Sequence, residues 1–521
     1  MHEPVFITSI YGRKYLPFLA PFVDSIAQTS PRARGLVLHA DVDPREIALL
    51  AAAYPAFTFA PTQAPQGNLH QRIARKLHLW RDACAALASS GVEAPLCLID
   101  CDTVVNRRFD HHLATNGEPE WDVIFTWKDE AFPINTGVML TRDAATGAAL
   151  FEELALRAER IVRDEAALHQ ACSVSGAADQ HALRELIGFV NYDRTILRTV
   201  AGREMIFKGV PCRQLNETNC RPITEDLCIT HYKTGWHPIL LEGGPFTKNR
   251  SEERCREMFQ EFRARTAQSA AAIPANIVAA AAHTHAPKFE PLCDGYEERG
   301  ILCSEMLAVC ATCAELNVDV IIESGRCRGQ STRTLARFFE GTGVKIVSIE
   351  LMKDDIGDWQ FAEAQLKPYS NVELLYGDAA KVVPEQLERF KGQRIALLLD
   401  GPKGLPAIEL IDNAFANSPD LLCAFLHDTR RDETLSPQRA LLEEGLAAGA
   451  RRVFMTDDEE FVARYRHLDN CCLPKQGAEI TMHTWRPHMK GEDTIGSYGP
   501  TLAVMMPACG VPKPVPAGSA A

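Results

Sequence analysis

The amino-acid sequence predicts an α/β protein built from two tandem α/β domains. The chain has 521 residues, which is more than one hydrophobic core usually organises. In both halves, short apolar segments typical of strands alternate with amphipathic segments typical of helices. An alanine-rich segment that contains Pro274 and Pro287 interrupts this alternation. Together these observations predict a mainly parallel sheet, covered by helices on both faces, in each half.

The alanine-rich segment sets the expected domain boundaries. Residues 1–262 are expected to form the first domain and residues 289–506 the second. Residues 263–288 are expected to be a linker that is partly helical. Residues 507–521 have the composition of a disordered tail. Each expected domain is long enough to bury a core of its own.

Composition argues against several classes of function. The formal net charge of −13 argues against a broad electrostatic surface for nucleic acid or anionic lipid. No apolar run approaches the ~20 residues of a membrane-spanning helix, so no integral membrane segment is expected. The N-terminus lacks the pattern of a secretory signal, and the 17 cysteines are scattered along the chain. We therefore expect a cytoplasmic protein with buried thiols.

The individual elements follow from the alternation of apolar and amphipathic segments. In the first half, strands are predicted at 5–12, 34–41, 96–102, 121–127 and 134–142, and helices at 18–30 and 68–89. In the second half, strands are predicted at 318–325, 345–351, 372–378, 394–401, 421–428 and 499–507, and a helix at 331–341. Ligands of such sheets bind at the carboxyl ends of strands, so the polar residues there are the candidates for function.

Two aspartates end the predicted strand at 96–102, which reads LCLIDCD. Side chains at positions i and i+2 of a strand share a face, so Asp100 and Asp102 converge on one point. Converging carboxylates repel each other unless a cation or a shared proton lies between them. Mn²⁺ and Mg²⁺ take oxygen ligands and commonly bridge to substrate phosphates. One interpretation is a metal site, and the other is a solvated turn with a helix-capping aspartate.

Six motifs occur in an order that resembles the GT-A glycosyltransferases, in particular the glycogenin-like and galactosyltransferase-like groups, which use nucleotide sugars. The resemblance covers roughly residues 4–240. The motifs are VFITSIYGRKYL at 5–16, RIARKLHLW at 72–80, LCLIDCDTVV at 96–105, INTGVMLTR at 134–142, ADQHAL at 178–183 and ITHYKTGWHP at 229–238. Each motif is short, but six in the same order are fairly specific.

This resemblance implies a metal-dependent donor site. Asp100, Asp102 and His231 would hold Mn²⁺ or Mg²⁺, and a nucleotide diphosphate sugar would be the donor substrate. The residues expected to bind that donor are Thr8, Tyr11, Lys76, Asn135 and Gly137, with Arg72 as the second choice after Lys76. Lys233 would add a further cation near the phosphates.

Two residues on the sugar side of the expected site, Asp179 and Asn135, each have a second possible role. Asp179 would face the reacting sugar as a catalytic residue, or it caps the helix that follows it. Asn135 would bond sugar hydroxyls, or it forms a turn before Gly137. One position departs from the glycogenin-like pattern, because His237 stands in the neighbourhood where that group has a lysine.

The second half begins with an apolar strand, a loop with two glycines and a helix, in the sequence VDVIIESGRCRGQSTRTLARFF. Gly325 and Gly329 allow a tight turn and the close approach of a ligand. The first N–H groups of the helix favour polar or anionic ligand groups. The following strand ends at Glu350, which suits two ribose hydroxyls. These features predict a nucleoside site.

This succession resembles the class I S-adenosylmethionine-dependent methyltransferases, in particular a group with a Glu-Ser-Gly…Gly-Gln-Ser-Thr loop and an Asp-Gly…His-Asp pair. It spans about residues 295–506 and implies an antiparallel last strand at 499–507. The residues expected to bind S-adenosylmethionine are Glu323, Gly325 and Gly329 for the methionine part, Glu350 for the ribose and Asp378 for the adenine amine. Cys327 departs from the family, which more commonly has glycine there, so a domain without cofactor is the alternative.

The acceptor side of the second half is expected at two strand ends. Asp400 and Asp428 would face the acceptor and share a metal, and Asp400 or His427 would be the catalytic base for methyl transfer. The whole sequence is thus interpreted as a bifunctional enzyme of polysaccharide biosynthesis. It would transfer a sugar to a glycan or other small acceptor and methylate a sugar or glycan hydroxyl. The alternative is a glycosyltransferase whose second domain only binds the acceptor.

Overall fold

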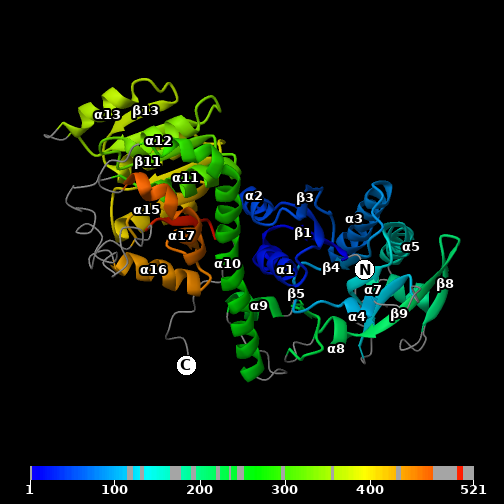
Figure 1. Cartoon of the computed structure of the whole chain (residues 1–521). Coiled ribbons are helices and arrows are strands. Elements are labelled where there is room, and N and C mark those ends of the chain that lie inside the picture. The colour runs from blue at the N-terminus through cyan, green and yellow to red at the C-terminus, as the bar shows by residue number, and fades with distance from the viewer. Residues whose placement is uncertain are drawn as a thin grey trace. The chain divides into compact units, whose positions relative to one another are not determined.

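The computed structural model of the chain, drawn in Figure 1, forms two compact units. The described residues are 3–113, 121–128, 134–164, 178–188, 195–218, 223–233, 236–242, 252–294, 300–353, 357–429, 436–472 and 501–508. Unit 1 comprises the described residues of Met1–Asp43 and Tyr54–Arg265. Unit 2 comprises those of Pro44–Ala53 and Thr266–Val511.

Unit 1 contains an eight-stranded sheet with the order β3-β2-β1-β4-β7-β6-β9-β8. Its strands are β1 (Val5–Tyr11), β2 (Arg34–Ala40), β3 (Phe57–Pro61), β4 (Leu96–Ile99), β6 (Val123–Trp127), β7 (Ile134–Thr141), β8 (Ile196–Val200) and β9 (Arg203–Pro211). All five strands predicted for this half are present. The sheet is mainly parallel, as expected, but two strands run against the others: β7 is antiparallel to both β4 and β6, and β8 is antiparallel to β9. Only residues 128–133 join β6 to β7, which is too short for a parallel crossover.

The helices of unit 1 are positioned by capping residues and by an apolar core. They are α1 (Leu16–Thr29), α3 (Leu69–Ser89), α5 (Ala144–Arg163) and α7 (Ala178–Ile187), with the short helices η1 (Arg13–Tyr15), α4 (Asp110–Leu113), α8 (Cys212–Leu215) and α9 (His237–Glu242). Asn68 and Gln71 form a reciprocal capping box at the start of α3. Helices α3 and α5 pack together, and the buried Trp80 meets Phe151 edge to face at 5.5 Å.

A separate two-stranded ribbon in unit 1 joins β5 (Thr103–Val105) to β10 (Ile229–His231). The two strands are antiparallel, and His231 lies opposite Thr103. The backbone N–H of Tyr232 also donates to the carbonyl oxygen of Asp102 at 2.7 Å. The ribbon therefore brings a segment more than 120 residues downstream directly beside the Asp-x-Asp turn.

Unit 2 contains a seven-stranded sheet with the order β13-β12-β11-β14-β15-β17-β16. Its strands are β11 (Val320–Ser324), β12 (Lys345–Glu350), β13 (Val372–Tyr376), β14 (Ile395–Leu399), β15 (Leu421–Leu426), β16 (Arg452–Met455) and β17 (Ala503–Met506). Strands β11 to β15 pair in parallel, as predicted. The last strand, β17, is antiparallel to both of its neighbours, also as predicted.

Helices complete unit 2. They are α2 (Pro44–Ala53), α11 (Cys303–Glu315), α12 (Gln330–Phe338), α13 (Asp358–Leu366), α14 (Ala379–Arg389), α15 (Leu405–Asn417), α16 (Ser436–Ala447), α17 (Glu459–Tyr465), η3 (Glu290–Leu292) and η4 (Arg466–Cys472). On α2, Glu46 forms a buried two-pronged ion pair with Arg452, at 2.6 and 2.8 Å. Predicted helix 331–341 corresponds to α12.

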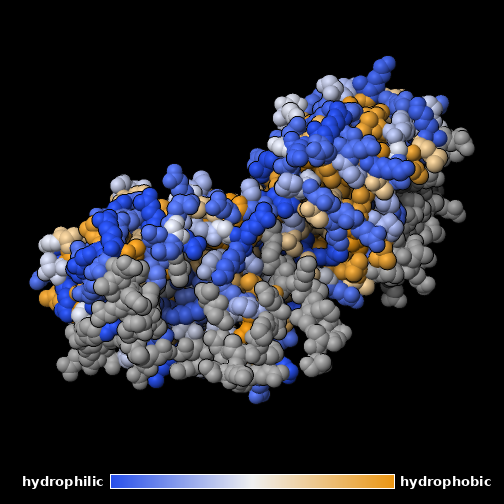
Figure 2. All heavy atoms as spheres, turned by 180° about the vertical axis from the view of Figure 1, so that it is seen from behind, coloured by the Kyte–Doolittle hydropathy of each residue, from blue (hydrophilic) through white to orange (hydrophobic). Residues whose placement is uncertain are grey.

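One long helix, α10 (Glu252–Phe289), includes the alanine-rich segment. Alanine has the highest helix propensity, and the segment predicted as a partly helical linker is helical here throughout. Among the helices of the described residues, none combines the length and the apolar character needed to cross a bilayer. Figure 2 shows hydrophilic residues over much of the visible described surface, with hydrophobic residues scattered among them.

Candidate functional site

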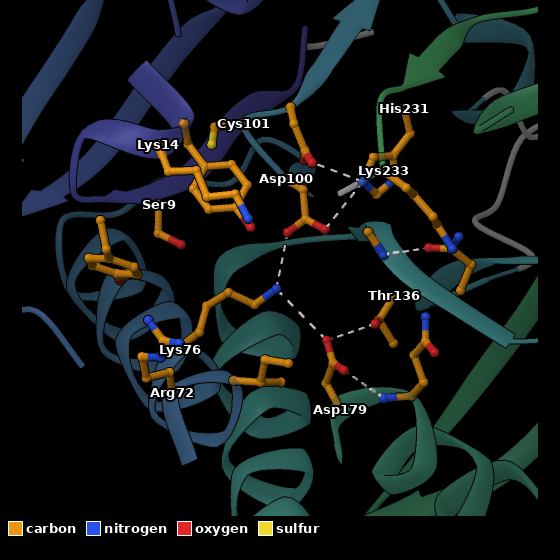
Figure 3. A pocket seen from close by; sticks show the side chains of 17 residues that line it. Ser9, Lys14, Arg72, Lys76, Asp100, Cys101, Thr136, Asp179, His231 and Lys233 are labelled. Atoms are coloured by element: carbon orange, nitrogen blue, oxygen red, sulfur yellow. Dashed lines mark hydrogen bonds and ion pairs between the residues drawn. The ribbon is translucent and has the colours of Figure 1, made fainter. Parts of the chain in front are cut away.

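The carboxyl ends of β1 and β4 meet the amino end of β7 around a cavity of about 760 Å³ in unit 1. Helices η1, α3 and α7 and strand β10 contribute further lining residues (Figure 3). The volume is within the range of about 300–1,000 Å³ that is usual for small-molecule sites. Most of the residues predicted for the donor site of the first half line this one cavity.

The structure brings Asp100, Asp102 and His231 together at the cavity. Nε2 of His231 lies 3.3 Å from Oδ1 of Asp102 and 3.7 Å from Oδ2 of Asp100. One ligand atom from each of the three side chains lies within 4.8 Å of the others. Figure 3 shows Asp100 and His231 directed toward each other. Two carboxylates and one imidazole are a suitable set for Mn²⁺ or Mg²⁺.

Backbone hydrogen bonds explain this convergence. The N–H of Asp100 donates to the carbonyl oxygen of Gly137 at 2.9 Å, which fixes the end of β4 against β7. Gly137 also leaves room for the cluster, since a Cβ at this position would lie 2.7 Å from Nδ1 of His231 and 3.0 Å from Oδ2 of Asp100. The sequence resemblance predicts Gly137 beside a donor sugar. In the structure, its missing side chain makes space for two of the candidate metal ligands.

Asp102 has a second histidine partner, His237 on α9. Nε2 of His237 lies 3.0 Å from Oδ2 of Asp102. Burial by itself would raise the pKa of Asp102, but the charges and hydrogen bonds of His231 and His237 outweigh burial and lower it well below the usual value. Asp102 is therefore an ionised, oriented carboxylate, as a metal ligand must be.

Lys76 on α3 places a cation at the same point. Its Nζ donates to Oδ1 of Asp100 at 3.0 Å and lies 3.8 Å from Oδ2 of Asp179 (Figure 3). It also lies over the ring of Trp80, 4.4 Å from its centroid. Burial would lower the pKa of Lys76, but Asp100 and Asp179 outweigh it and raise the pKa above its ordinary value. The ammonium group is therefore charged in the cavity wall.

The other predicted residues of the donor site have individual environments. Asp179, in the first turn of α7, accepts from Oγ1 of Thr136 at 2.8 Å and from the N–H of Gln180 at 2.9 Å. Oδ1 of Asn135 accepts from the N–H of Gly137 at 2.8 Å. Nδ2 of Asn135 is buried and has no partner among the described residues, although Asn135 lines the cavity. An unpaired buried donor of this kind points to a ligand oxygen.

One predicted donor residue does not line the cavity. Thr8 is buried in β1, whereas its neighbour Ser9 lines the cavity together with Tyr11. Because side chains alternate along a strand, Tyr11 shares a face of β1 with Ser9 and not with Thr8. Sequence reasoning also missed Lys14 and Gln180, which line the cavity. Lys14 follows the carboxyl end of β1, and Gln180 belongs to a motif from which sequence reasoning singles out only Asp179.

The predicted cofactor loop of unit 2 is held mainly by contacts within the chain. Glu323 is fully buried and accepts hydrogen bonds from the hydroxyls of Ser331, Thr332 and Ser348. Burial raises the pKa of Glu323, and these three hydroxyls partly oppose the rise. Glu323 thus ties α12 and β12 to the end of β11. Its side chain serves the loop's own architecture in this structure.

The two glycines of this loop have conformations that only glycine adopts readily. Gly325 has φ +97°, and a Cβ there would lie 2.7 Å from the carbonyl carbon of Asp400. Gly329 has φ +86° and precedes the first residue of α12. Gly325 therefore permits the loop to pack directly on the end of β14.

The remaining predicted cofactor residues lie at the ends of the next two strands. Glu350, at the end of β12, accepts from the N–H of Cys327 at 2.6 Å and from that of Leu351 at 2.8 Å. Asp378 is exposed and caps α14 through the N–H of Ala380 at 3.0 Å. Both carboxylates therefore lie at the carboxyl edge of the sheet, where the sequence predicts them.

Asp400, His427 and Asp428 also come together, at the ends of β14 and β15. Nδ1 of His427 lies 2.7 Å from Oδ1 of Asp400. Lys403 contacts both aspartates, and its Nζ lies 2.8 Å from Oδ2 of Asp428. Burial would lower the pKa of His427, but Asp428, Asp400 and Glu305 outweigh it and raise the pKa to about 10. Sequence reasoning missed Glu305, whose Oε2 lies 3.3 Å from Nε2 of His427.

Comparison with known proteins gives limited similarity. No known family matches the chain, and no curated protein matches it. Among solved structures, the glycosyltransferase GlyE of Streptococcus pneumoniae TIGR4 is 10% identical, with a TM-score of 0.36 over 79% of this chain and 90% of that one. The galactosyltransferase LgtC, solved with donor and acceptor sugar analogues, is 14% identical, with a TM-score of 0.31 over 50% and 94%. Cofactor-bound Rv0187 from MTB is 16% identical, with a TM-score of 0.23 over 44% and 89%. Because these similarities are weak, any function proposed for this chain must rest on the geometry of its site.

Proposed function

We propose that unit 1 is a metal-dependent glycosyltransferase that takes its sugar from a nucleotide diphosphate sugar. The observation that carries this proposal is the convergence of Asp100, Asp102 and His231 at one wall of a cavity, with Lys76 beside them. The residues fit a hard divalent ion, because two carboxylate oxygens and one imidazole nitrogen face a common point. A bound Mn²⁺ or Mg²⁺ would supply Lewis-acid stabilisation of the diphosphate leaving group.

The residues of the chain would perform the other tasks. Lys76, Lys14 and Lys233 line the cavity and would bind phosphate oxygens as point charges. Tyr11 and Ser9, at the end of β1, would contact the nucleoside. These contacts would hold the leaving group in one orientation while the bond to the sugar breaks.

The sugar would lie toward β7 and α7. Nδ2 of Asn135 would donate to a sugar hydroxyl, which would satisfy its buried N–H groups. Asp179, held by Thr136 and near Lys76, would accept from a second hydroxyl of the sugar. Sugar recognition would therefore depend on one donor and one acceptor at the same wall.

The test is a screen of nucleotide sugars with Mn²⁺ and with a chelator, scored by released nucleoside diphosphate. We expect release with a subset of donors, dependence on the metal and loss of release in Asp102→Asn. Asp82→Asn, which changes an exposed carboxylate on α3, is the matched control and should leave release unchanged. Release that persists in chelator or in Asp102→Asn would reject the metal assignment.

Asn135→Asp separates sugar recognition from nucleotide binding. The substitution keeps the oxygen that accepts from the N–H of Gly137 but replaces the unpaired amide donor by an acceptor. Affinity for a nucleotide sugar should fall about 10-fold or more, since one hydrogen bond and its donor are lost. Affinity for the matching nucleoside diphosphate, which has no sugar, should change little. Equal losses for both ligands would place Asn135 outside the sugar site.

For unit 2, S-adenosylmethionine-dependent O-methylation of a sugar or glycan is our proposal. It is supported by the parallel strands β11 to β15 with an antiparallel β17, and by Glu350 and Asp378 at the carboxyl edge. The raised pKa of His427 keeps it protonated at neutral pH, so Asp400 is the better candidate for the base. The alternative remains a second domain that binds the acceptor without methylating it.

Calorimetric titration of the full chain with S-adenosylmethionine separates these two functions of unit 2. We expect binding in the wild type and at least 10-fold weaker binding in Glu350→Gln, since a carboxylate that bonds ribose hydroxyls is lost. Glu373→Gln, on the neighbouring strand β13, is the control. Absence of heat at millimolar cofactor would favour the acceptor-binding domain.

A further inference from the structure

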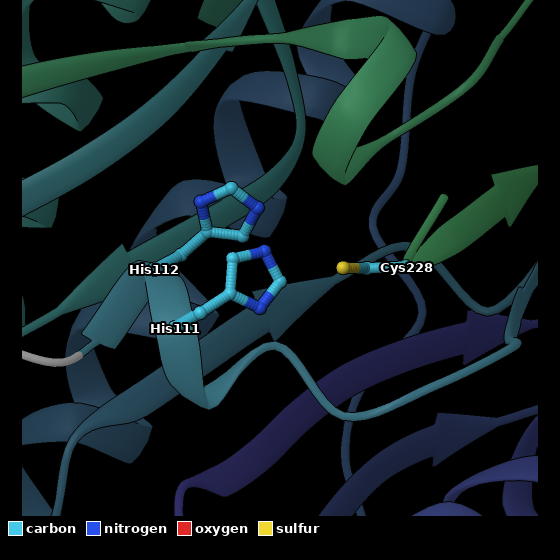
Figure 4. A group of neighbouring side chains, drawn as sticks. All are labelled: His111, His112 and Cys228. Carbon is cyan, nitrogen blue, oxygen red and sulfur yellow. The ribbon is translucent and has the colours of Figure 1, made fainter. Parts of the chain in front are cut away.

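A second group of side chains in unit 1 has the composition of a metal site, and neither half of the proposed function uses it. It consists of His111 and His112 on α4 and Cys228 immediately before β10 (Figure 4). One ligand atom from each of the three lies within 4.8 Å of the others. Figure 4 shows the sulfur of Cys228 pointing toward the two imidazole rings. The group differs from the Asp100 cluster because it offers sulfur and nitrogen in place of carboxylate oxygen.

The geometry of the two histidines is unusual for neighbours in a helix. Adjacent residues of a helix normally project about 100° apart, yet these ring centroids are 3.9 Å apart. His112 is 9% exposed, and its Nε2 is buried with no partner in the part of the chain that the structure describes. Such a nitrogen costs free energy unless a ligand pairs with it. His111 is exposed, which leaves the group accessible from solvent.

Both segments that carry the group are held in place by other contacts. Phe109, just before α4, is buried and meets Phe6 of β1 at 5.9 Å. The carbonyl oxygen of Cys228 accepts from the N–H of Asn106 at 2.7 Å, and its N–H donates to the carbonyl oxygen of Gln214 at 3.1 Å. The sulfur itself has only long contacts, at 3.7 and 4.0 Å, with backbone carbonyl oxygens of the described residues. The ligand atoms are thus presented by an ordered backbone.

We propose that His111, His112 and Cys228 bind Zn²⁺ or a similar borderline-soft ion. Zinc takes imidazole nitrogen and cysteine sulfur at about 2.0 and 2.3 Å, and tetrahedral geometry then separates its ligands by about 3.3–3.8 Å. The three ligand atoms now lie within 4.8 Å of one another. They therefore need to approach one another by at most about 1.5 Å to reach this geometry. Solvent reaches the exposed His111 and supplies the fourth ligand.

The site would brace the ribbon that carries His231. Cys228 and His231 are three residues apart, at opposite ends of β10. A metal that joins Cys228 to α4 fixes one end of β10, and the other end presents His231 to Asp100 and Asp102. The binding free energy of the ion would stabilise the folded unit.

The test uses the full chain with Asp102→Asn, so that the cluster of Asp100, Asp102 and His231 contributes little to metal binding. The protein is stripped with chelator and titrated with Co²⁺, whose complexes with thiolate absorb in the near ultraviolet, and then with Zn²⁺. We expect one equivalent of Co²⁺ with thiolate absorption, displacement by Zn²⁺ and a higher melting temperature with either ion. His111→Gln should weaken Co²⁺ binding at least 10-fold. Because His111 is exposed, the substitution should leave the packing of the hydrophobic core unchanged.

Two further variants decide which thiol is involved. Cys228→Ser should abolish the thiolate absorption. Cys471→Ser, which removes a thiol that lies 3.3 Å from Cys303 in unit 2, should leave it intact. Absorption and melting shifts that are equal in the Asp102→Asn protein and its His111→Gln derivative would overturn the site. Loss of the absorption in Cys471→Ser but not in Cys228→Ser would also overturn it.

Discussion

His237 holds Asp102 in place through Nε2, which lies 3.0 Å from Oδ2 of the carboxylate and 2.7 Å from the carbonyl oxygen of Tyr232. His237 is almost fully buried, and its ring packs at a tilt against that of Phe18, with the ring centroids 4.5 Å apart. One oxygen of Asp102 therefore faces His237 and the other faces His231. The first histidine sets the direction in which the carboxylate presents its remaining oxygen.

Replacing His237 by phenylalanine should weaken metal binding without removing a ligand. The ring still packs on Phe18, but Asp102 loses a hydrogen bond that fixes its orientation. Loss of such a supporting bond typically costs 10–100-fold in metal affinity. Titration of Mn²⁺, followed by the decrease of its free-ion spin-resonance signal, measures the effect. His283→Phe, on the exposed side of α10, should bind as the wild type does, and equal affinities in all three proteins would contradict the role of His237.

Gly137→Ala should disrupt the candidate metal site by steric conflict. The new methyl group would lie 2.7 Å from Nδ1 of His231 and 3.0 Å from Oδ2 of Asp100, so at least one of them must move. We expect Mn²⁺ affinity to fall at least 10-fold, together with a loss of roughly 1–3 kcal/mol in the free energy of unfolding. Calorimetry with Mn²⁺ and urea unfolding measure the two effects.

The control for Gly137→Ala is Gly91→Ala. Gly91 has φ +71°, so alanine is strained there, but a Cβ at this position would have no described atom within 4 Å beyond its chain neighbours. This variant should lose stability without losing Mn²⁺ affinity. If both variants bind Mn²⁺ equally well, the close approach of β7 to His231 does not matter for the metal.

Lys76→Met should change metal and nucleotide binding in opposite directions. Lys76 donates to Asp100 at 3.0 Å, so its charge competes with a divalent ion for the same carboxylate. Without nucleotide, the variant should bind Mn²⁺ several-fold more tightly. With Mn²⁺ present, it should bind a nucleoside diphosphate at least 10-fold more weakly, because a charge-assisted bond to phosphate is lost. Lys391→Met, at an exposed lysine, is the control and should leave both affinities unchanged. If Lys76→Met changes the affinities for Mn²⁺ and for the nucleoside diphosphate in the same direction, Lys76 does not have these two opposed roles.

The candidate metal ligands could be predicted from sequence because the position of the Asp-x-Asp pair after a buried strand is a local signal. The strand β4 ends at Ile99, however, so Asp100 and Asp102 converge from a turn and not from one face of a strand. The role of His237 could not be predicted, since it arises only when the β5–β10 ribbon brings residues 135 positions apart into contact. Thr8 does not line the cavity, whereas Ser9 does, and the two-residue repeat counted from the predicted Tyr11 already indicated Ser9.

The overall architecture could be predicted better than its strand directions. The alternation of strands and helices predicted α/β units, and the antiparallel β17 came from a resemblance. The antiparallel β7 was missed, although the short connection at 128–133 was a usable signal. Glu323 was interpreted as a cofactor contact because an acidic residue at a strand end can serve a ligand or its own loop. Three hydroxyls from the following helix and strand hold the Glu323 carboxylate, and its contact with a cofactor stays a prediction.

Asp469 should make the stability of unit 2 depend on pH between about 4 and 7. It is buried, and it accepts from the N–H and the hydroxyl of Ser304 at 2.8 and 2.7 Å. Burial raises the pKa of Asp469 from its usual 3.8 to about 7, although the bonds from Ser304 oppose the rise. Over this range the folded protein keeps a proton that the unfolded chain loses. The contribution of Asp469 to stability therefore falls as pH rises, by at most about 1.4 kcal/mol per pH unit.

Asp469→Asn should remove this pH dependence. The amide still offers an oxygen to the N–H of Ser304, and its own N–H group can donate to the hydroxyl, so the contacts survive without a titrating group. The variant should match the wild type near pH 4 and exceed it in free energy of unfolding above pH 7. Urea unfolding from about pH 4 to pH 8 measures the difference between the two proteins. Asp82→Asn, an exposed carboxylate in unit 1, should give a curve parallel to that of the wild type. If the Asp469→Asn curve is also parallel, Asp469 is already ionised in the folded protein at pH 5.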